Sequence, residues 1–523
     1  MKQNKIFQQQ QMTSPRMSAF DLSREQKLSC KLGELVPTYL EEVLPGDQFR
    51  VKTESLVRFA PMLAPIMHRV DVFMHYFFIP NRLVWADWEE FISGDRDGQG
   101  VQPTFPTINA NGSWASVAGD NKLADYLGLP VQELGNNLTP NFPVSQLPFR
   151  AYQQVYNDYY RDPNLEDEVD FSTYTNYIQL RNRKWEKDYL TSALPFVQRG
   201  TAAGVPIDVQ YATNSSVKIG DGTGYPPSGT LSAGAAGQVG GESYRDLQGS
   251  NNLAVRIENL QASLDFQINE LRKASALQRW LEKQALGGYR YIETIYSHFG
   301  VKSSDRRLQR AEYLGGGKTP VLISEVLNTS ATTNPTDSNE VMPQGTMTGH
   351  GISSGETMTF QTQIEEHGYI MGIMSIMPKP VYMNGVARHW LRNDKFDYFW
   401  PELANLGEQE VKDVEVMVTD NAVTNDSTFG YQQRYAEYKY GRSTVHGDFR
   451  TSLDYWHMAR VFAKDSEGDG PRLNATFMDC DHNDDEISNI FAVDDGTDTC
   501  WVQLYHDVKA RRPMPYFANP SLI

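Results

Sequence analysis

Cysteine is scarce in this sequence. Its 523 residues include only three cysteines, Cys30, Cys480 and Cys500. They are far apart and form no CxxC pair, which argues against a disulfide framework and against a zinc or redox motif. Free thiols are typical of proteins that fold in a reducing compartment, so we expect this chain to fold in a cytosol.

Long apolar runs are also absent. No stretch of about 18 apolar residues occurs in the chain, so the sequence predicts no transmembrane helix and no membrane insertion. Residues 1–17, MKQNKIFQQQQMTSPRM, include two lysines but no apolar run after them, unlike a secretory signal. We interpret residues 1–27 as a flexible N-terminal arm.

Basic residues are fewer than acidic ones. The sequence has 48 lysines and arginines against 65 aspartates and glutamates, which gives a formal net charge of −17. Such a balance argues against a protein whose whole surface binds nucleic acid. Any contact with nucleic acid must therefore be a local basic patch.

The sequence does contain a strand that is apolar on both faces, RVDVFMHYFFIP at 69–80. With the period of two of a β-strand, Phe73, Phe77 and Ile79 lie on the face opposite Val72, Met74 and Tyr76. Leaving such side chains in water costs about 1.5–3 kcal/mol each. We therefore expect an inserted segment of the same chain, or a neighbouring copy, to pack against Phe73, Phe77 and Ile79.

Other stretches predict the remaining strands of a mainly β chain. Two strands precede residue 69, separated by the turn residues Pro45, Gly46 and Asp47. In the second half, we expect strands in EEHGYIMGIMSIMPKPVY and in HGDFRTSLDYWHMARVF. Together these stretches favour a β-sandwich.

Helical periodicity and one polar stretch lie between the two sets of strands. LPFRAYQQVYNDYYRD, at 147–162, places tyrosines on one helical face, which we interpret as packing. Residues 200–255 are rich in Gly, Ser, Ala and Thr, so we expect a variable surface insertion there. A helical insertion segment is expected to follow at about 261–314.

The acidic motifs do not complete a calcium-binding loop or a catalytic carboxylate pair. Asp479, Asp481 and Asn483 are spaced like the start of a calcium loop, but its later glycine and glutamate are missing. A solvated acidic face is the preferred interpretation, and a weak divalent site is the alternative. Glu365 and Glu366 are the best carboxylate pair, yet neighbours in a strand point to opposite faces. We expect no enzyme activity, no catalytic residue and no cofactor.

Basic side chains gather in three places. Because none is interleaved with aromatic residues, any contact with DNA would involve phosphates and would not read sequence. Pairing with acidic groups of neighbouring subunits is an equally good interpretation. The clusters are Arg181, Arg183 and Lys184 with Lys187; Arg306, Arg307 and Arg310; and Arg511 with Arg512.

Seven blocks of the sequence resemble the major capsid protein of the microviruses, small tailless phages with circular single-stranded DNA, and in particular its gokushovirus branch. The blocks are FDLSREQKLSCKLGELVP, MHRVDVFMHYFFIPNRLVW, LPFRAYQQVYNDYYRD, SHFGVKSSDRRLQRAEYLGGG, EEHGYIMG, FDYFWPELANLGEQEV and FGYQQRYAEYKY. They are distributed over most of the chain, whereas its end, MPYFANPSLI, is only loosely like the usual terminus of the family.

The resemblance implies a single eight-stranded antiparallel jelly roll over residues 28–523, with long inserted loops and several α-helices. It also implies self-assembly into an icosahedral (T=1) shell around the single-stranded DNA genome, in the cytoplasm of a host bacterium. An internal scaffolding protein and a small basic DNA-binding protein are the further partners that it implies. The acidic net charge agrees with a separate basic partner, because this chain alone cannot neutralise a genome.

The insertion at 200–255 resembles the loop that forms outward protrusions on gokushovirus shells. Tyr225 and Tyr244 lie in it and are our candidates for contact with a host surface receptor. The alternative function is that of a monomeric β-sandwich protein that binds or cleaves carbohydrates, because the chain is rich in aromatic and acidic residues.

Overall fold

The computed structural model describes most of the chain. The described residues are 17–93, 103–108, 122–130, 143–197, 268–287, 309–327, 329, 345–464, 470–481, 485–493 and 497–517, with short strands within 132–137 and 209–262. The chain divides into two compact units, one made of Met1–Pro195 with Asp305–Ile523 and the other of Phe196–Ser304.

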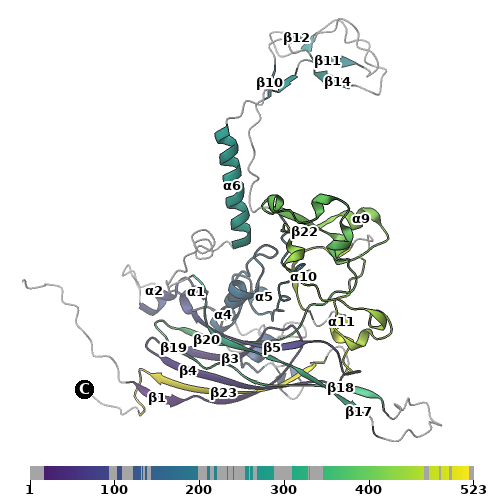
Figure 1. The fold of residues 1–523 in the computed structure, drawn as a ribbon. Helices are drawn as coiled ribbons and strands as arrows, with labels where there is room; N and C mark the ends of the chain where they lie inside the picture. The colour runs from purple at the N-terminus through teal and green to yellow at the C-terminus, as the bar shows by residue number, and fades with distance from the viewer. Residues whose placement is uncertain are drawn as a thin grey trace, which may run out of the picture. The chain divides into compact units, whose positions relative to one another are not determined.

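The first unit contains two antiparallel sheets, so the chain is mainly β as expected (Figure 1). One sheet has the order β16-β5-β20-β3 and the other has the main path β1-β23-β4-β18-β17, with β2 paired to β23 and β19 paired to β4. The strands of the first sheet are β3 (Val36–Val43), β5 (Val70–Pro80), β16 (Glu312–Pro320) and β20 (Gly368–Pro378). Those of the second are β1 (Ser18–Asp21), β2 (Arg24–Cys30), β4 (Gln48–Phe59), β17 (Leu322–Leu327), β18 (Met347–Glu356), β19 (Phe360–Gln363) and β23 (Cys500–Arg512).

Strand β5 has the two buried faces that its sequence predicted. Val72, Met74 and Tyr76 belong to a core that also contains Val51 of β4 and Leu504 of β23, so this core lies between the sheets. All residues of β5 except the partly buried His75 are buried, which agrees with a strand covered on both sides.

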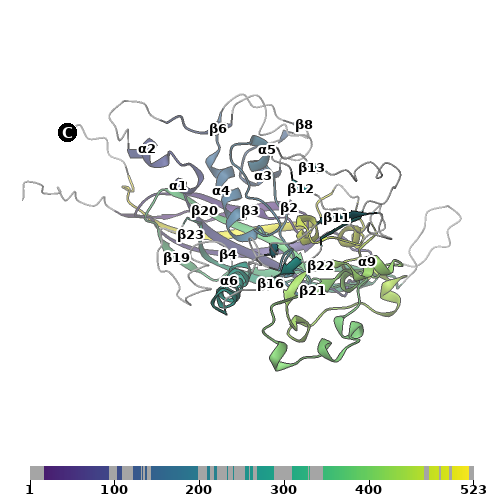
Figure 2. The ribbon, with the colours of Figure 1, turned by 90° about the horizontal axis from the view of Figure 1, so that it is seen from above.

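The other face of β5 is covered by an inserted segment of the same chain. Phe77 and Ile79 form a second core with Phe149, Tyr152 and Val155 of α4 (Leu147–Val155). Figure 2 shows α4 over this sheet. The segment also contains α1 (Asn81–Val84), α2 (Trp88–Ser93), α3 (Lys122–Tyr126), α5 (Tyr174–Tyr177), the π-helical turn η1 (Tyr156–Tyr160), and the strand pairs β6 (Thr107–Ile108) with β9 (Val144–Ser145) and β7 (Gln132–Glu133) with β8 (Asn136–Asn137).

The tyrosines of α4 and η1 pack as the periodicity indicated. Tyr152 and Tyr156 are buried. The Tyr152 hydroxyl donates a hydrogen bond to the Leu35 carbonyl at 2.8 Å, and the Tyr156 hydroxyl donates to Glu166 at 2.9 Å. Buried hydroxyls with partners avoid the cost of an unsatisfied polar group. This confirms the packing role that we expected, for Tyr152 and Tyr156.

The described residues within 380–493 form a lobe with few regular elements. Tyr382, Val411, Val416 and Phe477 of the lobe share a third core with Tyr189 and its neighbours. Its elements are β21 (Glu408–Lys412), β22 (Thr428–Gln433), α8 (Asp413–Val416), α9 (Ala422–Asp426), α10 (Ala475–Met478), α11 (Asp485–Ser488) and the 3-10 turns η3 (Arg388–Leu391), η4 (Lys395–Asp397), η5 (Pro401–Leu403), η6 (Ala436–Tyr438), η7 (Gly447–Arg450) and η8 (Asp454–Trp456).

Three boundaries differ from the sequence-based expectations. Residues 446–462 contain η7 and η8 instead of a sandwich strand, and the last strand of the second sheet is β23. The arm expected at 1–27 is extended strand from Ser18 onward, because β1 and β2 pair with β23 along its edge. The helical segment expected to end at 314 ends earlier, since Glu312 already pairs with Phe78 in the sheet.

The second unit contains α6 (Ile268–Gly287) and three nested antiparallel strand pairs. These are β10 (Val209–Tyr211) with β15 (Leu260–Ala262), β11 (Val217–Gly220) with β14 (Ala254–Ile257), and β12 (Ser232–Ala233) with β13 (Val239–Gly240). The polar stretch at 200–255 therefore contains short paired strands that its composition did not predict. Among the described residues no helix is long and apolar enough to cross a membrane.

Gly316 in β16 is a site where we predict a large loss of stability. A Cβ atom there would lie 2.3 Å from the Met74 carbonyl oxygen, so the backbone of β5 would have to move. We expect Gly316→Ala to lower the free energy of unfolding by more than about 2 kcal/mol. Gly441→Ala is the control, because its Cβ meets nothing within 4 Å, and it should change stability by less than about 0.5 kcal/mol. Urea unfolding followed by circular dichroism measures both, and equal stabilities would contradict the prediction.

Candidate functional site: an exposed aromatic surface

Besides Tyr440, six large aromatic side chains among the described residues of the lobe are exposed to solvent. Trp390 is 75% exposed, and the other five are between 46% and 54% exposed. Soluble monomers rarely leave large contiguous apolar areas in water, so exposed groups of this kind mark interaction sites. We call this set the aromatic surface: Trp390, Phe396, Tyr398, Phe399, Trp400 and Tyr438.

Arg392 brings part of the aromatic surface together. Its guanidinium carbon lies 4.6 Å from the centre of the Tyr438 ring and 5.2 Å from that of Tyr398. Phe399 contacts Tyr438 with ring centres 6.4 Å apart. Arg392 also pairs with Glu437 at 3.2 Å. These contacts fix Tyr398, Phe399 and Tyr438 beside one another, so a partner would meet ordered rings.

A buried ion pair between Glu415 and Arg388 lies inside the lobe. Glu415 is 1% exposed and accepts hydrogen bonds from Arg388 and from the Tyr189 hydroxyl, both at 2.8 Å. Burial raises the pKa of the Glu415 carboxyl above its usual value, although Arg388 opposes the shift. Arg388 begins η3, which also carries Trp390. The pair therefore ties the aromatic surface to the core of the lobe.

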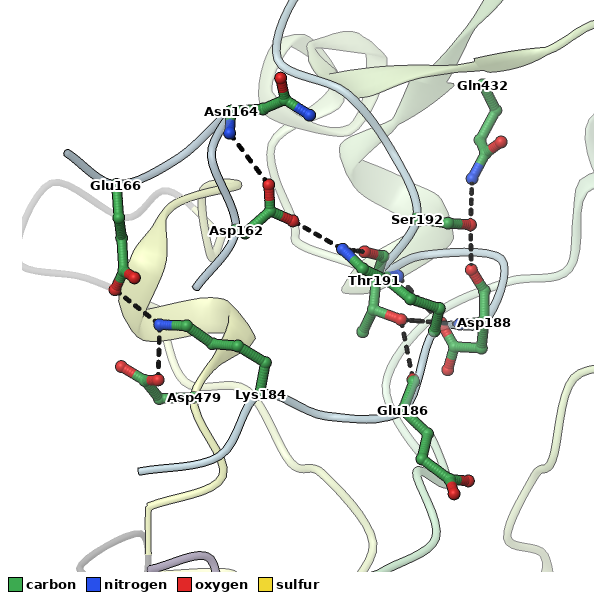
Figure 3. A network of polar contacts seen from close by, with 11 residues as sticks. Asp162, Asn164, Glu166, Lys184, Glu186, Asp188, Thr191, Ser192, Gln432 and Asp479 are labelled. Carbon is green, nitrogen blue, oxygen red and sulfur yellow. Dashed lines mark hydrogen bonds and ion pairs between the residues drawn. The ribbon is translucent and has the colours of Figure 1, made fainter. Parts of the chain in front are cut away.

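The first basic cluster is occupied by contacts within the subunit. Lys184 is 8% exposed, and its Nζ atom lies 2.6 Å from Glu166 and 2.7 Å from Asp479 (Figure 3). The guanidinium of Arg183 lies 3.9 Å from the centre of the Phe73 ring, and Arg181 donates to Gln153 and to the Asn176 carbonyl. The structure corrects the expectation that Lys184 faces DNA, because burial and two carboxylates take up its charge.

The network around Lys184 joins three parts of the subunit. Figure 3 shows Glu166 and Asp479 pointing toward Lys184 from different segments of the chain. Nearby, Asp188 accepts a hydrogen bond from the Tyr382 hydroxyl at 2.7 Å, and Gln432 donates to Ser192 at 2.7 Å. The segment 182–194 therefore links the inserted segment to the lobe.

We predict that Lys184→Met destabilises the subunit. The change leaves Glu166 and Asp479 facing each other without a cation. Removing one partner of a fully buried ion pair costs about 3–5 kcal/mol, and because both carboxylates are partly exposed we expect a loss of about 2–3 kcal/mol here. Lys187→Met is the matched control. Lys187 is 54% exposed and pairs with Asp162 at 2.6 Å, so its loss should cost less than about 1 kcal/mol. Thermal unfolding of both variants checks this, and equal losses would contradict it.

The other predicted basic and acidic residues have mixed outcomes. Arg306, Arg307 and Asn483 lie outside the described residues, as do Tyr225 and Tyr244. Arg310 is partly exposed, with its guanidinium 5.8 Å from the Tyr159 ring centre. Asp479 is engaged by Lys184, and among the described residues no group of three or more His, Cys, Asp or Glu side chains is arranged to hold a metal ion.

The carboxylates Glu365 and Glu366 lie in the loop between β19 and β20, so the alternation of strand neighbours does not apply to them. Both line a hollow of about 380 Å³ together with Arg310 and Glu312. Glu366 pairs with Arg82 at 2.7 Å, which holds its charge in an ion pair. Exclusion of a carboxylate pair on grounds of strand geometry was therefore wrong, although this arrangement gives no support to a glycoside-cleaving site.

The aromatic surface was missed by the sequence reasoning, which used FDYFWPELANLGEQEV only for its family resemblance. A signal was available in the sequence. In a strand Phe399 would lie opposite the other three rings, and in a helix Tyr398 would lie away from the other three, so no single face can bury Phe396, Tyr398, Phe399 and Trp400 together.

Comparison with known proteins assigns the chain to a family. The family model described as Capsid protein (F protein) matches residues 8–522. Capsid protein VP1 of Chlamydia phage 1 is 32% identical over 97% of this chain and 96% of its own length. Capsid protein VP1 of Bdellovibrio phage phiMH2K is 34% identical over 88% of this chain and 87% of its own length, and VP1 of Spiroplasma virus 4 is 30% identical over 94% and 92%. The chain therefore belongs to the microvirus capsid protein family, which confirms its resemblance to the gokushovirus branch.

Proposed function

We propose that this capsid protein self-assembles into a closed icosahedral (T=1) shell that encloses a circular single-stranded DNA genome in the cytoplasm of a host bacterium. The observation that carries the proposal is the aromatic surface. Half-exposed rings that are held in place by Arg392 suit a contact that repeats between copies, because closed shells reuse one patch on every subunit. An internal scaffolding protein and a small basic DNA-binding protein are the partners that we expect during assembly.

We also propose that the two sheets form an eight-stranded jelly roll. The support is the order in which the chain visits the sheets. Strands β3, β5, β16 and β20 belong to one sheet, and β4, β17, β18 and β23 to the other, so the chain crosses between the sheets repeatedly. β18 and β19 pair with successive parts of β4 and count as one interrupted strand. In this proposal β1 and β2 are an added edge along β23.

The test of assembly is negative-stain microscopy of the purified chain, alone and with the internal scaffolding protein. We expect uniform closed particles or pentameric precursors. A chain that is strictly monomeric under both conditions would refute the proposal. The alternative, a monomeric protein that binds or cleaves carbohydrates, predicts binding to or turnover of a glycan panel by that monomer, whereas the capsid proposal does not need either.

We propose that the insertion at 200–255 forms outer protrusions used for attachment to a host receptor. Trimming residues 220–241 should leave shell formation nearly unchanged, because loop length alters closure entropy only slowly. Infection of the host should fall, which plaque counts measure against particle counts. Trimmed protein that precipitates without shells would contradict a surface position for this segment.

A further inference from the structure

The outward face of the second sheet carries exposed aromatic rings. Along β23 the side chains alternate, and Val502, Leu504 and Val508 are buried in the core. Trp501 and Tyr505 lie on the opposite face and are 48% and 41% exposed. Neither ring has an aromatic partner within the described part of the chain. Both therefore present a flat apolar surface to solvent.

The same face carries three arginines that are free of carboxylates. Arg50, Arg58 and Arg511 are exposed, and no Asp or Glu oxygen among the described residues lies within 4 Å of them. The acidic groups of this face pair with lysines instead: Lys52 with Glu54 and Glu356, Lys509 with Asp21 and Asp507. Two lysines meet four carboxylates, so with the three arginines the groups named here carry a formal charge of only +1, in a chain whose net charge is −17.

Across the strands one ring faces a cation, whereas Tyr505 is directly opposite Glu54 on one side and Glu25 on the other. Trp501 is directly opposite Arg58, and Arg50 is directly opposite Lys509. At one end of the face is a hollow of about 800 Å³, whose lining includes Arg50, Lys509, Arg511 and the amides of Gln48, Gln361 and Gln363. Guanidinium groups bind phosphate, and side-chain amides hydrogen-bond to the edges of bases.

We propose that this face, defined by Trp501, Tyr505, Arg50, Arg58 and Arg511, binds single-stranded DNA through base stacking and phosphate contacts. The proposal rests on the proposed function, since it names the surface that meets the enclosed genome. Stacking on an exposed ring requires an unpaired base, so the face should prefer single strands to duplexes. Charge complementarity favours this occupant, because phosphate groups can pair with the three arginines that have no carboxylate partner.

The spacing of the face suits a short run of nucleotides. With a rise of about 3.3 Å per residue, the two rings lie about 13 Å apart, and Arg50 and Arg58 about 26 Å apart. Single-stranded sites on other β-folds cover about 4–16 nucleotides. One subunit would therefore bind a few nucleotides without reading their sequence.

The experiment measures binding of a fluorescent 20-nucleotide oligothymidylate to the full-length chain, at several salt concentrations, beside a hairpin duplex of equal length. We expect Trp501→Leu and Tyr505→Leu each to weaken single-strand binding roughly 5- to 150-fold with an unchanged salt dependence. Trp501→Phe keeps a ring and should restore most of the affinity. Arg50→Gln with Arg58→Gln and Arg511→Gln should make the slope of log affinity against log salt shallower by about 2. Lys439→Gln, an exposed cation of the lobe, should change neither quantity.

Shell yield, counted by microscopy for every variant, separates this proposal from the proposed function. Wild-type chain that forms no shells refutes the proposed function, whatever it binds. Variants that form shells and bind the oligonucleotide as the wild type does overturn the DNA surface alone. Loss of shells with unchanged binding would mean that a second copy of the chain occupies this face, and it would also overturn the proposal, as would equal affinity for the duplex.

Discussion

Shells should fail to form from the double variant Trp390→Glu with Phe396→Glu, although the subunit should still fold. Both side chains are at least half exposed, so the subunit loses little of its own packing. At a contact between copies the two new carboxylates would have to leave water, which costs several kcal/mol unless they are paired. The change recurs at every copy of the contact, so we expect loss of shells and not merely a lower yield.

Sedimentation and negative-stain microscopy measure the yield of shells, and circular dichroism measures the melting temperature of the subunit. Met358→Glu is the control, because Met358 is 79% exposed but lies in the loop between β18 and β19, outside the aromatic surface. It should assemble normally. Normal shells from the double variant would show that the aromatic surface does not join copies.

Acid should destabilise the subunit between pH 6.5 and about pH 4. Burial lowers the pKa of His68, His75 and His506 from 6.5 to about 4 in each case. Between these values the unfolded chain binds protons that the folded chain does not, so the free energy of unfolding falls as the pH falls. At about 1.4 kcal/mol for each unit of pKa, each histidine removes about 3 kcal/mol by pH 4. Above pH 6.5 this contribution is fully present.

The groups around His75 explain its shift. Its Nδ1 atom lies 2.8 Å from the Tyr160 hydroxyl, and the rings of Phe73, Phe77 and Tyr313 surround the imidazole. Burial among these rings disfavours the charged form, and the nearby Arg183 guanidinium disfavours it further. Burial also raises the pKa of Glu415 and Asp479. Near pH 4 the folded chain therefore binds protons at these carboxyls more readily than the unfolded chain, which partly opposes the loss of stability.

Urea unfolding at pH values from 7.5 to 5 measures this dependence. We expect an uptake of about three protons on unfolding near pH 5.5, and about two in His75→Gln. Met358→Gln is the control, because it changes an exposed side chain that has no titratable group, and it should leave the uptake unchanged. An uptake near zero in the wild type would mean that these histidines are protonated in the folded chain.

The parts of the fold that were predicted are those with a strong local pattern. Strand β5 was predicted because apolar residues on both faces leave few alternatives to a central strand. Which segment covers it could not be predicted, since Phe149 and Tyr152 pack on Phe77 and Ile79 from some 70 residues away along the chain. The edge strands β1 and β2 were missed because their pairing with β23 joins the two ends of the sequence.

The functional surfaces were harder to predict than the strands. Lys184 was interpreted as a contact for DNA or for acidic groups of a neighbouring subunit, because its partners within the subunit, Glu166 and Asp479, are 18 and 295 residues distant along the chain. By contrast, Trp501 and Tyr505 alternate with buried apolar residues in CWVQLYHDVKARR, and this period of two was visible in the sequence. Only the tertiary structure shows which cations have a carboxylate partner. Lys52 pairs with Glu54 and Glu356, whereas Arg58 has no such partner among the described residues.

A reconstruction of the assembled particle at side-chain resolution tests the central claim most directly. We predict that Trp390, Phe399 and Trp400 of one copy are buried against a neighbouring copy, whereas the same side chains are between 46% and 75% exposed in the isolated subunit. Rings that remain open to solvent on the particle, with the copies joined elsewhere, would contradict it.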